Sequence, residues 1–367
     1  MTSHTHAAEI SVFEDDPHAL KAWIKAQALA LGFSDCVIAK PDAQAEIPRL
    51  QEYLDRGYHG DMGFLAENIE KRANPALLVP NTRSIICVRM DYLVELPEPR
   101  TVPDAPNSAM IARYARGRDY HKTMRSRLKQ LASIIREKVG EFESRPFADS
   151  APIFEKSLAE NAGMGWTGKH TLLIHQKAGS FFVLGELFSS LELPFDQPAS
   201  KHCGSCTACL DICPTQAIVE PYMLDARRCI AYLTIEYKGI IPEDLRAGIG
   251  NRVFGCDDCQ LICPWNSFAK TTTVADFEPR HGLDQVSLLD LWQWDETTFL
   301  ANTEGSPMRR TGYQSFMRNI AIGLGNAPYS QQIVTALASS RGLHDEIVQV
   351  HIDWAIQQQH SKAESTD

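Results

Sequence analysis

The hydrophobic pattern of the first 190 residues alternates between helical and strand-like segments. Asp16 and Pro17 predict the cap and first turn of a helix whose apolar face comprises Leu20, Trp23, Ile24, Ala28 and Leu31. The run Ser84–Met90 predicts a buried strand, and Tyr120–Phe142 predicts a long amphipathic helix. Such alternation predicts an α/β or α+β domain.

A glycine-rich turn follows the predicted helix Ile153–Asn161 and precedes two strand-like runs, Thr171–His175 and Ser180–Leu191. The turn contains Gly163-x-Gly165-x-x-Gly168, which matches a dinucleotide-binding fingerprint and is close to a phosphate-binding loop. Both motifs require a strand before the loop and a helix after it. Because the predicted order here is helix, turn and strand, we interpret the glycines as a helix stop.

Three regions are predicted along the chain, with an α+β fold overall. Residues 1–193 form an α/β domain, residues 194–275 contain most of the cysteines, and residues 276–367 are helical. Prolines and polar residues between Pro194 and Pro198 mark the first boundary. The helical patterns of the last region are Ser315–Leu324, Gln331–Ser339 and His344–Gln357.

The composition is that of a packed globular protein, with 44% hydrophobic and 22% charged residues. No apolar run reaches the length of a membrane span, and Met1–His6 lacks the basic and apolar parts of a signal peptide. We therefore expect a cytoplasmic protein that does not bind membranes. The net charge of −10 argues against nucleic-acid binding over the whole surface, but it leaves a local basic face open.

Eight of the ten cysteines lie between Cys203 and Cys263, which indicates metal binding rather than disulfides in a protein expected in the cytosol. Cys36 and Cys87 stand apart, and we interpret both as small core residues. The run Cys203-x₂-Cys206-x₂-Cys209-x₃-Cys213-Pro214 matches the bacterial ferredoxin pattern. Cys229 and Cys256-x₂-Cys259-x₃-Cys263-Pro264 form a second set in which an insertion displaces the first cysteine.

Reciprocal ligation distributes the eight thiolates over two 4Fe–4S clusters with none left over. The first cluster is predicted to bind Cys203, Cys206, Cys209 and Cys263. The second is predicted to bind Cys213, Cys229, Cys256 and Cys259. Two structural zinc sites are the alternative, but zinc favours separated pairs of cysteines over a Cys-x₂-Cys-x₂-Cys-x₃-Cys-Pro run.

Iron–sulfur clusters transfer single electrons, so the reaction requires another centre. Asp149 and Ser150 precede a predicted helix, and on the residues alone helix capping is favoured over catalysis. The stretch Ile111–Lys122 is dense in Arg, Tyr and His. This stretch fits two interpretations equally well. It is either the solvent-exposed start of a basic helix or a site that binds phosphates and nucleotide bases.

Several motifs together resemble the epoxyqueuosine reductase family. Besides the cysteine pattern they are Lys71-Arg72-x-Asn74-Pro75, Arg113-Tyr114-Ala115-x-Gly117-Arg118-Asp119-Tyr120-His121, Asp149-Ser150-Ala151-Pro152 and Gly165-Trp166-x-Gly168-Lys169-His170-Thr171. The likeness extends from about residue 20 to about residue 325. It implies a cobalamin-binding N-terminal domain, a ferredoxin-like domain with two clusters, and a short C-terminal region with HEAT-like helical hairpins.

The resemblance also implies a reaction, namely reduction of epoxyqueuosine to queuosine at the wobble position of the tRNAs for Asp, Asn, His and Tyr. Electrons would pass from the clusters to cobalamin, with a small redox protein as donor and the enzyme acting as a monomer. A reductive dehalogenase and a non-catalytic electron carrier are the alternatives. Dehalogenases usually carry a twin-arginine export signal, and a carrier would not need about 200 residues ahead of its clusters.

The resemblance assigns roles to individual residues. Asp149 is the acid that protonates the departing oxygen, and burial would have to raise its pKa. Arg72 matches a cobalamin contact, and Lys156, Lys169 and His170 lie on segments expected to face the same pocket. No protein ligand to cobalt is implied. A basic face for tRNA is expected from two groups, Arg113, Arg116, Arg118, Lys122, Arg125, Arg127 and Lys129, and Arg309, Arg310 and Arg318.

Overall fold

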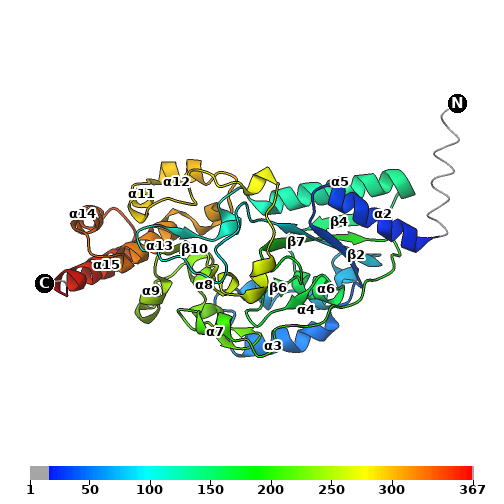
Figure 1. The fold of residues 1–367 in the computed structure, drawn as a ribbon, viewed down its shortest axis with the longest axis horizontal. Coiled ribbons are helices and arrows are strands. Elements are labelled where there is room, and N and C mark those ends of the chain that lie inside the picture. The colour runs from blue at the N-terminus through cyan, green and yellow to red at the C-terminus, as the bar shows by residue number, and fades with distance from the viewer. Residues whose placement is uncertain (1–15, 366–367) are drawn as a thin grey trace.

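The protein is described by a computed structural model covering residues 16–365, so the N-terminal residues used to argue against a signal peptide lie outside it. The molecule is elongated, with a sheet at one end and helices at the other (Figure 1). The central sheet has the strand order β1-β2-β7-β4, and every pair in it is antiparallel. Its strands are β1 (Asp35–Ala39), β2 (Ser84–Asp91), β7 (Phe182–Ser189) and β4 (Ser144–Phe147).

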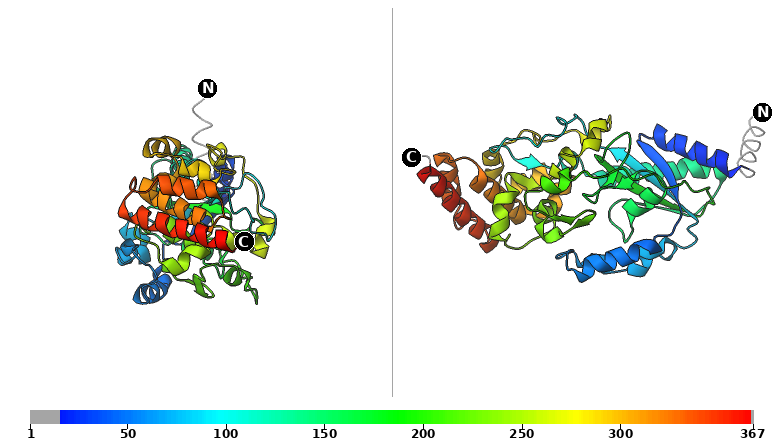
Figure 2. Two further views of the ribbon diagram at one scale, coloured as in Figure 1. Left: turned by 90° about the vertical axis from the view of Figure 1, so that its left-hand side faces the viewer. Right: turned by 60° about the horizontal axis from the view of Figure 1, so that its bottom comes forward.

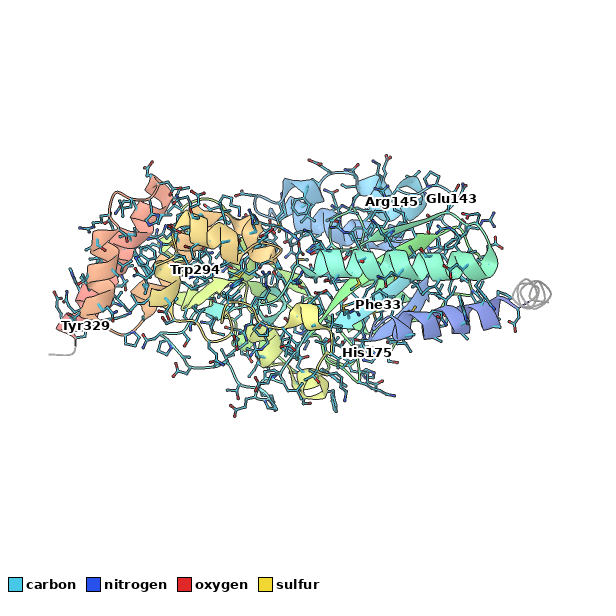
Figure 3. All side chains as sticks on the ribbon, turned by 90° about the horizontal axis from the view of Figure 1, so that it is seen from above. Phe33, Glu143, Arg145, His175, Trp294 and Tyr329 are labelled. Carbon is cyan, nitrogen blue, oxygen red and sulfur yellow. The ribbon has the colours of Figure 1, made fainter. Side chains whose placement is uncertain are left out.

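Alternating residues of the buried strands face opposite sides of this sheet, as the two-residue period requires. Ile86 and Val88 pack beneath the helices α2 (Pro17–Ala30) and α5 (Tyr120–Val139), which lie side by side (Figure 3). Ile85 and its neighbours pack on the other side against α6 (Glu155–Asn161). The helices α3 (Ile47–Asp55) and α4 (Ile69–Ala73) lie below this second face (Figure 2).

The strand pairing corrects the expected class of the N-terminal region. An α/β domain has parallel strands joined by crossover helices, whereas this sheet is wholly antiparallel and therefore belongs to an α+β arrangement. The helix predicted to end at Phe142 ends at Val139, because Gly140 has φ of 85° and terminates it. Cys36 and Cys87 are buried in the cores on the two sides of the sheet, which confirms their interpretation as core residues.

The glycine-rich turn leads into a small hairpin that the sequence did not predict. β5 (Trp166–Thr167) pairs with β6 (Leu173–Ile174), and a Cβ on Gly165 would lie 2.1 Å from the Ile174 carbonyl oxygen. Glycine is therefore required here by close backbone approach. Because α6 precedes the turn and a strand follows it, the rejection of both nucleotide-binding motifs is confirmed.

The cysteine-rich segment consists of short elements between the sheet and the C-terminal helices. β10 pairs in parallel with β3, which ties this segment to the N-terminal region. The elements are β3 (Met110–Ile111), α7 (Ala208–Asp211), β8 (Ile218–Glu220), β9 (Met223–Leu224), α8 (Ile230–Ile235), α9 (Glu243–Ile249), β10 (Arg252–Phe254) and α10 (Asp258–Leu261).

The C-terminal part is helical, as predicted, and Trp294 and Tyr329 mark it in Figure 3. One apolar core joins its helices to α8, α9 and β10. Its helices are α11 (Leu288–Trp292), α12 (Glu296–Asn302), α13 (Tyr313–Asn326), α14 (Gln331–Ser339) and α15 (Glu346–Glu364). The last helix extends beyond the predicted Gln357, because Gln, Lys and Glu sustain a helix without an apolar face. Among the described residues, no helix is long and apolar enough to cross a membrane.

Candidate active site and cysteine clusters

Asp149 lies on the loop between β4 and α6 and has φ of 49°, an uncommon conformation for a residue with a side chain. Its Oδ2 atom accepts a hydrogen bond of 2.6 Å from the Tyr120 hydroxyl and lies 3.6 Å from His121 Nε2. Its backbone amide donates to Glu155 Oε1 at 2.6 Å. The N-cap of α6 is Phe154, which has no side-chain cap, so the capping role for Asp149 is wrong.

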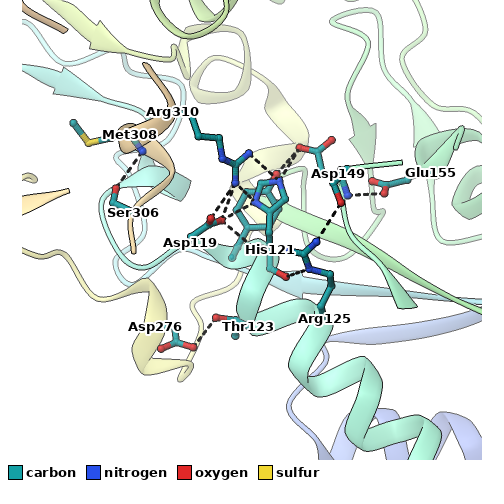
Figure 4. Close-up of polar contacts among 12 residues, drawn as sticks. Asp119, His121, Thr123, Arg125, Asp149, Glu155, Asp276, Ser306, Met308 and Arg310 are labelled. Atoms are coloured by element: carbon teal, nitrogen blue, oxygen red, sulfur yellow. Dashed lines mark hydrogen bonds and ion pairs between the residues drawn. The ribbon is translucent and has the colours of Figure 1, made fainter. Parts of the chain in front are cut away.

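Tyr120 and His121 form the first turn of α5, and Asp119 caps that helix. Asp119 Oδ1 lies 2.7 Å from His121 Nδ1, so the imidazole is placed between two carboxyl groups. Arg310 comes from the distant turn Pro307–Thr311, and its guanidinium lies 3.0 Å from Asp119 Oδ2 and 3.3 Å from His121 Nε2 (Figure 4). The site is thus assembled from two regions of the chain.

The electrostatics of this group correct the expectation for Asp149. Burial tends to raise the pKa of Asp149, but the nearby His121, the hydrogen bond from Tyr120 and the charge of Arg310 lower it below its ordinary value. Burial tends to lower the pKa of His121, but Asp119 and Asp149 raise it. The direction for Asp149 is therefore opposite to the expected one, whereas the pKa of His121 is raised above its ordinary value.

A cavity of about 700 Å³ opens beside Asp149. Arg72 and Lys156, two of the predicted cobalamin contacts, line it together with Asp149. Arg72 is held by the carbonyl oxygen of Phe64, 3.0 Å from its Nη2 atom, and Lys156 Nζ donates to the Thr171 carbonyl at 2.8 Å. A second cavity of about 310 Å³ shares three lining residues with the first, Phe154, Lys156 and Ser157.

Lys169 and His170 line a different cavity, of about 290 Å³, so the structure divides the five predicted residues between two places. Lys169 Nζ donates to the carbonyl oxygens of Gly204 and Cys206, both at 2.8 Å. His170 is buried, and burial and the charge of Lys156 lower its pKa to about 4. Both residues therefore lie against the cysteine-rich loop rather than beside Asp149.

The structure brings the four cysteines predicted for the first cluster together at one cavity. Four line the 290 Å³ cavity, Cys203, Cys206, Cys209 and Cys263. The pKa of the Cys209 thiol is raised to about 11 by burial and by three neighbouring thiols, Cys263, Cys203 and Cys206. Cys259 lies near cysteines of both predicted groups, because burial and then Cys229, Cys209 and Cys213 raise its pKa. The influence of Cys209 on Cys259 places the two groups next to each other, where α7 and α10 meet.

The burial of the two groups differs. In the first group Cys206 is exposed while Cys209 and Cys263 are buried, whereas the four cysteines of the second group are all partly buried. Cys229 enters this second group at the start of α8, after the inserted segment that contains β8 and β9. The insertion noted in the sequence thus forms the extra hairpin that carries Cys229 back to its partners.

The predicted basic face does not form as one surface. Arg318 is fully buried and donates to the carbonyl oxygens of Leu233, Tyr237 and Gly239. Arg113 is paired with Asp257, and the guanidiniums of Arg116 and Arg127 bind backbone carbonyl oxygens. These four are structural residues, because their charges compensate buried acceptors.

A smaller basic stripe remains on α5. Lys122 and Lys129 are exposed, and Arg125 lies between them at helical spacing with its Nη1 atom 3.4 Å from Ser150 Oγ. Ser150 lines the 700 Å³ cavity, so this stripe runs along the helix toward the mouth of the cavity. We call Lys122, Arg125 and Lys129 the α5 stripe.

Some residues of the site were not predicted. Tyr120 and His121 were noted in a basic, aromatic stretch and in a family motif but were given no role, and Glu155 and Glu186 were not noted at all. Glu186 is completely buried in β7. A single carboxyl group within the apolar run Ser180–Leu191 was the signal that could have identified it, because buried carboxyl groups need a partner.

Comparison with known proteins identifies the family. Residues 72–150 match the family model described as epoxyqueuosine reductase QueG, DUF1730, and residues 202–266 match a 4Fe-4S double cluster binding domain. The epoxyqueuosine reductase of Pseudomonas aeruginosa is 53% identical over 343 residues, covering 93% of this chain and 95% of that protein. The chain belongs to the epoxyqueuosine reductase family. The Escherichia coli K12 member is 50% identical over 344 residues, covering 94% and 90% of the two chains.

Solved epoxyqueuosine reductases share the fold. The Streptococcus thermophilus structure has a TM-score of 0.84 and 27% identity, covering 93% of this chain and 90% of that one. A Bacillus subtilis structure, solved with its catalytic aspartate loop swung out of the active site, has a TM-score of 0.83 at 27% identity and covers 94% and 91%. A further epoxyqueuosine reductase structure contains an epoxyqueuosine-modified tRNA-Tyr stem loop. It has a TM-score of 0.79 and 25% identity, and the match covers 94% of this chain and 100% of that one.

Proposed function

We propose that this protein reduces epoxyqueuosine to queuosine at the wobble position of tRNAs for Asp, Asn, His and Tyr. The observation that carries the proposal is the identity of about half of all residues with epoxyqueuosine reductases over nearly the whole chain. The placement of Asp149 at the wall of a large cavity supports the same conclusion. A base that leaves its stack can enter such a cavity from a single-stranded loop.

For the cofactors, we propose two 4Fe–4S clusters with the ligand sets Cys203, Cys206, Cys209 and Cys263, and Cys213, Cys229, Cys256 and Cys259. The two groups of mutually close thiols support these sets, and four thiolates are what each cluster requires. Because Cys206 is the one exposed cysteine of the eight, electrons are expected to enter from a small redox protein at the first cluster.

We propose that cobalamin binds in the 700 Å³ cavity within the domain of residues 1–193, with Arg72 and Lys156 among its contacts. The lining suits it, because apolar side chains such as Phe64, Ile153 and Leu172 can cover a corrin ring while polar residues meet its amide side chains. When bound, the cofactor supplies the strongly reducing centre that the protein side chains lack. Lys169 and His170 lie at the first cysteine group and are assigned to cobalamin only through the family resemblance.

The side chains of the chain itself handle the protons. Removal of the epoxide oxygen as water consumes two electrons and two protons, and the first proton must reach the oxygen as its bond to carbon breaks. Asp149 Oδ2 is hydrogen-bonded to Tyr120 and lies close to His121 Nε2, so the pair of Asp149 and His121 holds one proton beside the cavity. We propose that Asp149 delivers this proton and that His121 supplies it to Asp149.

The test is anaerobic purification of the full chain, reconstitution with iron, sulfide and cobalamin, and incubation with a tRNA-Tyr stem loop carrying epoxyqueuosine. The expected result is about eight iron atoms per chain, a cobalamin absorbance band, and loss of one oxygen from the RNA by mass spectrometry. Reduction of organohalides instead of RNA would favour a dehalogenase, and binding of clusters without cobalamin would favour an electron carrier. We further propose that the protein is a cytoplasmic monomer whose residues 276–367 form a short HEAT-like region.

A further inference from the structure

Two carboxyl groups, one of them fully buried, lie behind the loop that carries Asp149. Glu155 begins α6 and lines the cavity, and Glu186 lies on the adjacent strand β7 with no exposed surface. Glu155 Oε1 accepts the 2.6 Å hydrogen bond from the Asp149 backbone amide (Figure 4). The carboxyl group of Glu186 lies close to that of Glu155, because α6 packs on β7 and the charge of Glu155 acts on Glu186.

A fully buried carboxyl group without a hydrogen-bond donor holds a proton, because burial disfavours its ionised form. Within the described chain, no amide, hydroxyl or charged nitrogen donates to either oxygen of Glu186. An isolated carboxylate in such a position is strongly unfavourable, and two adjacent carboxylates are more so. The pair therefore holds one proton together, and one oxygen of Glu155 stays free to accept from Asp149.

We propose that Glu155 and Glu186 are positioning residues whose one shared proton holds the Asp149 loop in the active site. The hydrogen bond to the Asp149 amide fixes a backbone conformation with φ of 49°, which a non-glycine residue adopts only when its surroundings impose it. Loss of the shared proton places two negative charges in a buried site next to Asp149. Their repulsion then releases the loop.

The pH at which this release occurs depends on every charged group around the pair. Burial, and then the charge of Asp149, raise the pKa of Glu155 to about 7, and burial raises that of Glu186 as well. His121 and Lys156 are the cations that face Glu155. Cys87 on β2 and Tyr120 on α5 also face the pair, and burial raises the pKa of each, so both stay neutral. Only His121 among these others titrates in the same range.

Amide hydrogen exchange of the cofactor-free protein tests the proposal without any need for turnover. In the wild type, protection of residues 148–154, corrected for the intrinsic pH dependence of exchange, is expected to fall about tenfold or more between pH 6 and pH 8.5, because the raised pKa of Glu155 is linked to the closed loop. Glu186→Gln supplies a permanent donor to Glu155, so its loop protection is expected to stay constant with pH.

Controls separate the shared proton from other causes. Glu155→Gln keeps an acceptor oxygen for the Asp149 amide and serves as a second pH-insensitive variant if Glu186→Gln does not fold. Glu160→Gln changes another carboxyl group of α6, which binds Thr167 and Lys201, and should retain the wild-type pH dependence. Infrared spectra should show a protonated carboxyl band that disappears through about pH 7 in the wild type and is missing in Glu186→Gln.

The inference rests on the proposed catalytic role of Asp149 only for its consequence in turnover. With an epoxyqueuosine-modified stem loop, Glu186→Gln is expected to move the alkaline loss of kcat upward by about one pH unit or more, with KM little changed. Identical pH dependence of loop protection in the wild type and in both variants would overturn the inference. An inactive protein with pH-dependent protection would instead count against the proposed function alone.

Discussion

At the scale of residues, the acid of this site is a group of coupled side chains rather than one carboxyl group. Asp149 is hydrogen-bonded to Tyr120, and His121 stands between Asp149 and Asp119. An aspartate alone would require burial to hold a proton at neutral pH. With His121 at 3.6 Å, the proton is available from the imidazole while Asp149 remains free to deliver it.

Replacement of Asp149 by Asn tests this division of roles. The variant is expected to lower kcat for epoxyqueuosine reduction by 10²-fold or more, because the amide cannot transfer a proton. Iron content and the cobalamin absorbance band should match the wild type, since Asp149 ligates neither group. A variant with wild-type kcat would contradict the role of Asp149 as the acid.

The raised pKa of His121 predicts how stability depends on pH. Asp119 and Asp149 favour the imidazolium in the folded state, so its stabilising contribution is complete below the ordinary pKa of about 6.5 and is lost as pH rises through the higher folded pKa. Urea unfolding of the cofactor-free protein should therefore show a decline above about pH 6.5. His121→Gln should lack this part of the decline, and an identical profile for both proteins would contradict the assignment.

At the scale of elements, α5 serves both the core and the active site. Its buried face packs on the sheet through Met124, Leu128, Leu131 and Ile135, its first turn supplies Tyr120 and His121, and its exposed side carries the α5 stripe. Helical periodicity made the buried face predictable. The exposed basic face could not be predicted in the same way. Clustering of arginines along the sequence does not reveal which of them bind backbone carbonyl oxygens, as Arg116 and Arg127 do.

The α5 stripe is expected to contact tRNA phosphates near the cavity. Reversing the charges of Lys122 and Lys129 to Glu should weaken binding of a tRNA stem loop and reduce the slope of log K against log salt by about 1 to 2, one contribution for each lost phosphate contact. Lys40→Glu with Arg341→Glu is the matched control, because it changes the net charge equally at other exposed positions. If both double variants lose the same tRNA affinity and the same salt dependence, the effect comes from the net charge and not from the α5 stripe.

At the scale of the whole molecule, the active site depends on parts of the chain far apart in sequence. Cysteine spacing alone predicted two thiol groups, because a ferredoxin run constrains its geometry locally. The antiparallel strand order and the contact between Glu155 and Glu186 were not predictable, because each joins segments whose pairing leaves no trace in local periodicity. The same holds for Arg310, expected at a tRNA-binding surface but found against Asp119 and His121.

Arg310 tests whether the C-terminal part completes the site. Arg310→Met keeps an aliphatic side chain but removes the charge that lowers the pKa values of Asp119 and Asp149 and opposes protonation of His121. We expect kcat to fall about tenfold, consistent with a misplaced acid–base pair, and its pH dependence to move upward. The change in unfolding free energy should stay within about 1 kcal/mol, since the guanidinium is half exposed.

Arg309, on the same turn as Arg310, provides the control for this experiment, because its guanidinium binds the Leu300 carbonyl of α12. Arg309→Met should leave the pH dependence of kcat unchanged even if it weakens tRNA binding. If both variants lose kcat equally with unaltered pH profiles, Arg310 acts through tRNA, as its position in the sequence first suggested. A shift in the pH dependence of kcat in Arg310→Met alone would mean that the C-terminal part controls the proton transfer at Asp149. Residues 149 and 310 would then act together although they are far apart in the sequence.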